Sequence, residues 1–131
     1  MNIGKDKIIK GKRLYERDFG DYEGSLISEV EINALRRWTD NAPTPNGETI
    51  RELAARVFEF LDDVLPNIKV EEIERKRIEP ENESSEIKIL FVVHGYVLRT
   101  MHWYFNGLPE EGDETVIETD NCGFYEFVVQ L

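Results

Sequence analysis

The fold that the sequence predicts depends first on residues 87–99, Ile87-Lys88-Ile89-Leu90-Phe91-Val92-Val93-His94-Gly95-Tyr96-Val97-Leu98-Arg99. Five apolar residues in a row, Ile89 to Val93, show no polar alternation. Such a run is typical of a strand that is covered on both faces in a parallel sheet. His94 and Gly95 follow it, and apolar residues then recur at helical spacing. The stretch therefore predicts a buried strand that ends at His94 and a helix that begins there.

The junction between this strand and this helix is the first candidate binding site. In an open α/β sheet, ligands bind just beyond the carboxyl end of a strand, where the next helix begins. A helix N-terminus presents unpaired N–H groups and a partial positive charge, so it favours an anion. We therefore expect an anion at His94 and Gly95. The alternative for a lone histidine is a ring that only satisfies a backbone carbonyl.

Composition limits the classes of protein and partner. A chain of 131 residues is long enough for one domain with a modest core, which we place over residues 1–131. Its net charge of −11 argues against duplex nucleic acid and anionic membrane as partners. One cysteine, Cys122, and the lack of an apolar leader in residues 1–12 predict a cytoplasmic protein. Two histidines and one cysteine suit no common metal site, so we expect neither metal nor cofactor.

Capping signals predict two further helices. A Ser-x-x-Glu box at residues 28–31 begins a helical apolar pattern that runs to Trp38. A Thr-x-x-Glu box at residues 49–52 begins a clearer amphipathic pattern, whose apolar face continues to Val64. We expect Pro66 to end this second helix.

The other segments are predicted from composition. Residues 7–10 and 124–129 are rich in β-forming side chains and predict a first and a last strand, whereas residues 13–24 predict an ordered loop. Residues 70–86 are densely charged and predict a solvated helix end followed by a linker. The helix after His94 is expected to end near Asn106-Gly107.

Four motifs occur in a fixed order along nearly the whole chain. They are Tyr15–Gly24 (YERDFGDYEG), Asn46–Thr49 (NGET), Phe91–Arg99 (FVVHGYVLR) and Asn121–Gly123 (NCG). In order and spacing the chain resembles the histidine phosphatase superfamily, which includes the cofactor-dependent phosphoglycerate mutases and many small phosphomonoesterases. The resemblance implies an α/β fold, a phosphoglycerate mutase-like three-layer sandwich with a mostly parallel sheet and helices on both faces.

The resemblance also implies a reaction and a set of residues. In this family a histidine attacks the phosphorus, a carboxylic acid protonates the leaving oxygen, and a second histidine with arginines holds the phosphoryl oxygens. Glu16 would then be the general acid, and Arg17 would reach a phosphate or carboxylate of the substrate. His94, with Gly95 at the start of the helix, would bind the phosphoryl group. The implied partner is a phosphorylated small molecule or a phosphate ion.

The sequence departs from the family at the nucleophile. The family carries its nucleophilic histidine in an Arg-His-Gly motif, which is absent here, and the only histidines are His94 and His102. We therefore expect an N-terminally truncated member. Its strand before His94 would keep an open edge that can pair with another chain.

Three interpretations follow. We favour an inactive or split remnant that retains part of a phosphate pocket and is either inactive alone or complemented by a separate N-terminal fragment. A non-catalytic module that binds an anion or forms a homodimer through the open sheet edge is the second. An active phosphatase with a rearranged site, in which His94 or His102 is the nucleophile, is the third.

Overall fold

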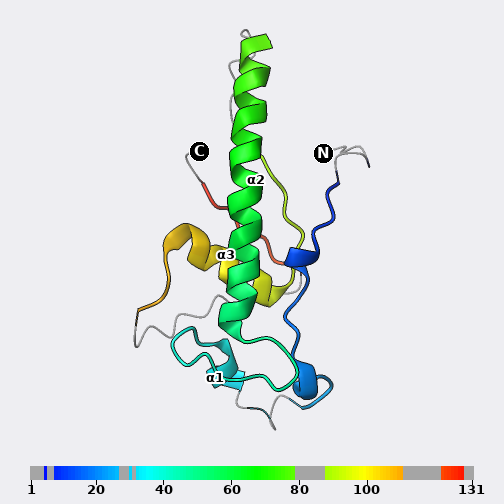
Figure 1. The fold of residues 1–131 in the computed structure, drawn as a ribbon, viewed down its shortest axis with the longest axis vertical. Helices are drawn as coiled ribbons and strands as arrows, with labels where there is room; N and C mark the ends of the chain where they lie inside the picture. The colour runs from blue at the N-terminus through cyan, green and yellow to red at the C-terminus, as the bar shows by residue number, and fades with distance from the viewer. Residues whose placement is uncertain are drawn as a thin grey trace.

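The computed structural model describes residue 5, residues 8–26, residue 30 and residues 32–78, 88–110 and 122–128. These parts of the chain form the α-helices α1 (Ile32–Arg36), α2 (Ile50–Ile78) and α3 (Gly95–Asn106), and the short 3-10 helices η2 (Lys12–Leu14) and η3 (Gly20–Tyr22). Helix α2 lies along the longest axis of the molecule, and α3 packs across it (Figure 1). The C-terminal part of α2 projects beyond the other helices (Figure 1).

Helix α2 begins where the sequence predicts. The backbone N–H of Thr49 donates to Glu52 Oε2 at 2.7 Å, and the N–H of Glu52 donates to Thr49 Oγ1 at 3.3 Å. This is the reciprocal bonding of a capping box, and it satisfies two N–H groups that the first turn leaves without helical partners. The apolar face that follows is buried, and it consists of Ile50, Leu53, Ala54, Val57, Phe60 and Leu61.

The expectation that Pro66 ends this helix is wrong, because α2 continues to Ile78. Proline removes one helical hydrogen bond, but neighbouring contacts hold the turn before it. Tyr104 Oη donates to Asp62 Oδ1 at 2.6 Å, which ties that turn to α3, and Asn67 Nδ2 donates to the carbonyl of Asp63 at 2.7 Å. The charged segment predicted over residues 70–86 is thus helical as far as residue 78, and residues 79–87 lie outside the described residues.

Helix α3 confirms its sequence prediction at both ends. It begins at Gly95 directly after His94, and it ends at Asn106. Gly107 takes a φ of 99°, which side chains other than glycine rarely adopt, and its N–H donates to the carbonyl of Trp103 at 2.9 Å. The core lies between the two long helices, where buried α2 residues meet Val97, Met101 and Trp103 of α3.

The prediction of an α/β three-layer sandwich is wrong for the part of the chain that the structure describes. No strand forms in the described parts of the predicted strands, which are residues 8–10, 88–93 and 124–128. Val92 is 87% exposed and Val128 90% exposed, so these segments are not covered on both faces either. A strand exists only when a neighbour completes its hydrogen-bond ladder, and no described segment supplies one. Apolar, β-branched composition alone cannot replace that partner.

The capping box at residues 28–31 lies outside the described residues, apart from Val30, and α1 spans part of the helix predicted after it. Among the helices described, none combines the length and the apolar character needed to cross a membrane.

Candidate active site

Glu16 lies at the N-terminus of α3. Its Oε1 accepts from the backbone N–H of Arg17 at 2.8 Å, and its Oε2 lies 3.4 Å from the backbone N of Tyr96, in the first turn of α3. The second contact joins residues that are 80 positions apart in the sequence. A carboxylate at this end of a helix is favoured by the helix dipole and by the unpaired N–H groups. The Tyr15–Gly24 motif, called the acid loop from here on, therefore meets the His94-Gly95 motif in space.

His94 is the residue that precedes α3. Its backbone is extended (φ −96°, ψ 170°), and its carbonyl accepts from the N–H of Leu98 at 2.9 Å. Its side chain is exposed and does not cap the helix, so the ring does not serve the local fold in that way. A Cβ added at Gly95 would meet no described atom within 4 Å. The space beside Gly95, at the N-terminus of α3, is therefore not filled by the described residues.

Arg17 is buried, a feature that the sequence analysis did not address. It is 2% exposed, and its guanidinium donates to the carbonyl of Glu48 (2.9 Å), the carbonyl of Leu35 (2.5 Å) and Thr44 Oγ1 (2.8 Å). Removal from water lowers the pKa of Arg17 below its usual value. Each guanidinium nitrogen thus has a protein acceptor, which gives Arg17 a structural role. Its contact with a substrate stays a prediction.

The acid loop is held against the segment before α2 by close backbone contact. The N–H of Asp21 donates to the carbonyl of Pro45 at 2.9 Å, and the N–H of Glu48 donates to the carbonyl of Asp18 at 2.9 Å. Gly20 has a φ of 51°, and a Cβ there would lie 2.1 Å from the carbonyl oxygen of Pro45. A Cβ at Gly47 would lie 2.6 Å from Gly20 N. Both glycines are therefore required for the two loops to approach so closely.

Two charged residues near the site escaped the sequence reasoning. Arg56, on α2, forms a bidentate ion pair with Glu48, with Nε–Oε1 of 2.9 Å and Nη2–Oε2 of 2.5 Å. Glu48 lies just before the start of α2, where an acidic residue is favourable for the helix dipole without any partner such as Arg56. Nothing in the apolar periodicity of α2 distinguishes Arg56 from a solvated arginine, so no local signal could have predicted this pair.

The other histidine lies within α3 rather than at its start. Asn106 Nδ2 lies 3.2 Å from His102 Nδ1, and the imidazole centroid is 6.1 Å from that of Phe127. His102 is thus packed by neighbours on α3 and in the C-terminal segment. It does not share the position of His94.

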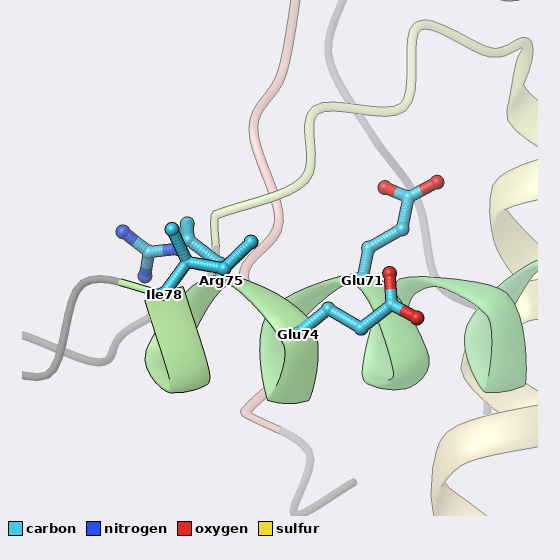
Figure 2. A pocket seen from close by; sticks show the side chains of 4 residues that line it. All are labelled: Glu71, Glu74, Arg75 and Ile78. Atoms are coloured by element: carbon cyan, nitrogen blue, oxygen red, sulfur yellow. The ribbon is translucent and has the colours of Figure 1, made fainter.

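A surface hollow among the described residues lies far from Glu16 and His94. It has a volume of about 290 Å³, and Glu71, Glu74, Arg75 and Ile78 line it at the C-terminal end of α2 (Figure 2). Two carboxylates on one wall are unfavourable for a phosphate. Among the described residues, no group of three or more His, Cys, Asp or Glu side chains is placed to hold a metal ion.

Comparison with known proteins identifies the family. The family model of the histidine phosphatase superfamily (branch 1) matches residues 2–130. The chain therefore belongs to the histidine phosphatase superfamily, as its motifs predict.

The relatives include phosphoglycerate mutases. The chain is 30% identical over 114 residues to a 2,3-bisphosphoglycerate-dependent phosphoglycerate mutase of Rhizobium etli, a match that covers 81% of the chain and 46% of the relative. The Methylobacterium radiotolerans enzyme of the same name is 26% identical over 118 residues, or 84% of the chain and 48% of the relative. A fructose-2,6-bisphosphatase TIGAR of Xenopus tropicalis is 39% identical over 59 residues, a match that covers 43% of the chain and 21% of the relative.

The matched region of the phosphoglycerate mutases is therefore about half of their length. No solved structure matches the chain significantly.

Proposed function

We propose that these 131 residues carry the acid and phosphoryl-binding half of a histidine-phosphatase site. The half-site would bind a phosphomonoester and would not turn it over without an added nucleophile. The observation that supports this proposal is the contact between Glu16 Oε2 and the N–H of Tyr96. It brings the acid next to the helix start that His94 precedes, and the family membership supplies the reaction.

Each residue has a distinct role in the proposed reaction. A phosphate oxygen accepts from the N–H of Gly95 at the start of α3, where an added Cβ would meet no described atom within 4 Å, while Glu16 keeps its contact with the N–H of Tyr96. The exposed imidazole of His94 donates to a second phosphate oxygen. The negative charge of the bound phosphate favours the protonated form of the neighbouring Glu16, which is held 3.4 Å from Tyr96 N and gives its proton to the bridging oxygen as the P–O bond breaks.

The nucleophile is the missing part. His102 is packed against Asn106 and Phe127, which makes it a poor candidate for in-line attack at the α3 N-terminus. We assign the nucleophilic histidine to a segment outside residues 1–131, on the same polypeptide or on a second one. The exposed apolar side chains of residues 88–93 provide a contact surface for that segment. The cytoplasmic location and the single partial domain over residues 1–131 stay predictions.

Free imidazole can test this proposal, because it can replace an absent histidine. Its unprotonated nitrogen attacks the phosphorus of phenyl phosphate, the P–O bond breaks, and Glu16 protonates the departing phenolate. The phosphoimidazole that forms is hydrolysed by water to phosphate and imidazole. The test compares phenol release with and without imidazole for the wild type, His94→Ala and Glu16→Gln, with His102→Ala as the matched control.

The proposal predicts that the wild-type chain releases phenol only when imidazole is present, at a rate above that of imidazole alone. His94→Ala and Glu16→Gln should lose this increase, whereas His102→Ala should keep it. Release by the wild type without imidazole, abolished in His94→Ala, would instead support an active enzyme with a rearranged site. An imidazole effect that is equal in all four proteins would refute the half-site.

A further inference from the structure

The ion pair between Arg56 and Glu48 lies beside the acid loop, and its two side chains are only 24% and 18% exposed. Both guanidinium nitrogens that face Glu48 meet a separate carboxylate oxygen, Nε at 2.9 Å and Nη2 at 2.5 Å. Two parallel bonds of this kind fix the plane of the guanidinium as well as its position. Arg56 is therefore held rigidly on α2 with further N–H groups to donate.

Those further N–H groups reach the backbone of Arg13, which precedes Glu16, and of Glu16 itself. Arg56 Nη1 donates to the carbonyl of Arg13 at 2.7 Å, and Nη2 donates to the carbonyl of Glu16 at 3.2 Å. The contacts span 43 and 40 positions of sequence, so they join the acid loop directly to the long helix.

Glu48 holds the other side of the loop. Its Oε2 lies 3.3 Å from the backbone N of Asp18, and its own N–H donates to the carbonyl of Asp18 at 2.9 Å. The pair thus fixes the backbone before and after Glu16. These contacts of Arg56 and Glu48 do not include the Glu16 carboxylate, so their influence on that carboxylate passes through the backbone.

We infer that Arg56, paired with Glu48, is the positioning residue that holds the Glu16 carboxylate at the N-terminus of α3. This inference rests on the proposed function, since it concerns the acid of that same site. Misplacement of a catalytic group by about 1 Å can cost on the order of 10²-fold in rate. A lysine at position 56 keeps the charge, but its three N–H groups lie on one nitrogen and cannot reproduce the four bonds that Arg56 makes from three nitrogens.

The chain offers a matched control on the same helix. Arg75 also makes a bidentate pair, with Nε–Oε2 of 2.9 Å and Nη2–Oε1 of 2.8 Å to Glu72. This second pair lies at the far end of α2, beside the hollow in Figure 2. Arg75→Lys therefore makes the same chemical change at a distance from the acid loop.

Two readouts test the inference, both well below the melting temperature. The first is the amide resonance of Tyr96 in isotope-labelled protein, which reports the Glu16 contact without any substrate. The second is imidazole-dependent phenol release. Glu16→Ala gives the Tyr96 resonance expected when the contact is lost. Glu48→Gln weakens the Arg56–Glu48 pair (the clamp) while keeping one acceptor oxygen. It is the second variant to be measured if Arg56→Lys does not fold.

We expect Arg56→Lys to move the Tyr96 resonance toward its Glu16→Ala position and to slow phenol release by roughly 10- to 100-fold. Arg75→Lys should change neither. A Tyr96 resonance that responds to Glu16→Ala but not to Arg56→Lys or Glu48→Gln would overturn the positioning role. If the resonance moves as expected while Glu16→Gln leaves phenol release unchanged, the positioning role stands and the proposed function fails.

Discussion

Replacement of Arg17 by methionine should destabilise the protein severely. Methionine retains much of the side-chain length but removes the guanidinium. The carbonyls of Leu35 and Glu48 and the hydroxyl of Thr44 then lose the donors that lie 2.5, 2.9 and 2.8 Å away. A buried acceptor left without a donor costs about 1–3 kcal/mol.

The substitution also has a stabilising effect, because it removes a buried charge. The cost of burying that charge is what lowers the pKa of Arg17 in the folded protein. We therefore expect a net loss of about 3 kcal/mol in the free energy of unfolding. For a domain of this size, that loss corresponds to a fall in Tm of about 10 °C.

Urea and thermal unfolding, followed by circular dichroism at neutral pH, measure this loss. Arg13→Met is the matched control, because Arg13 pairs with the exposed carboxylates of Glu59 and Asp63. Exposed pairs of this kind contribute about 0–1 kcal/mol. If Arg17→Met were no more destabilising than Arg13→Met, the assignment of Arg17 as a buried structural hub would be refuted.

Three other changes have expected outcomes. Gly47→Ala places a methyl group 2.6 Å from backbone atoms of the facing loop, so urea unfolding should show a loss of about 2–3 kcal/mol, and a loss under about 0.5 kcal/mol would contradict the close approach. Hydrogen bonds from the Thr49 backbone and side chain lower the pKa of Glu52, so its stabilisation is present above about pH 4.3 and is lost as the pH falls through the lowered pKa. Glu52→Gln should therefore lower Tm at neutral pH but not at low pH, and a pH-independent difference would contradict this cause. The hydrogen bond to Asp62 raises the pKa of Tyr104 to about 12, so its stabilisation is present below about pH 10 and is lost as the pH rises toward 12. Ultraviolet absorbance should show one tyrosine titrating late, and that step should be missing in Tyr104→Phe.

The helices could be predicted from the sequence wherever the signals are local. The Thr49–Glu52 box and the Gly107 stop each act within one turn, so the sequence locates both in advance. Pro66 is the exception, because contacts from α3 and from Asn67 outweigh its local effect.

The strands could not be predicted in the same way. Residues 88–93 have the apolar run of a buried strand, yet a strand depends on a partner that lies elsewhere in the chain or outside it. A run of β-forming residues indicates that a segment can form a strand, but it does not show which other segment pairs with it.

The candidate site was only partly accessible to sequence reasoning. The motifs around Glu16 and His94 indicated the family, which the comparisons confirm, and the structure brings these two segments together. The burial of Arg17 depends on contacts across 18 to 31 positions of sequence, and Arg56 reaches the backbone of Arg13 and Glu16 across 43 and 40 positions. No periodicity or spacing within a single element encodes such contacts.

The most direct test of the half-site is the effect of inorganic phosphate on Tm at constant ionic strength, with chloride as the reference salt. At a phosphate concentration of about 100 times its Kd, binding to the folded state alone adds about 2.7 kcal/mol. We predict that phosphate raises the Tm of the wild type and of His102→Ala, and that the increase is lost in His94→Ala. An equal increase in all three proteins, or none in the wild type, would contradict a phosphate-binding half-site at the start of α3.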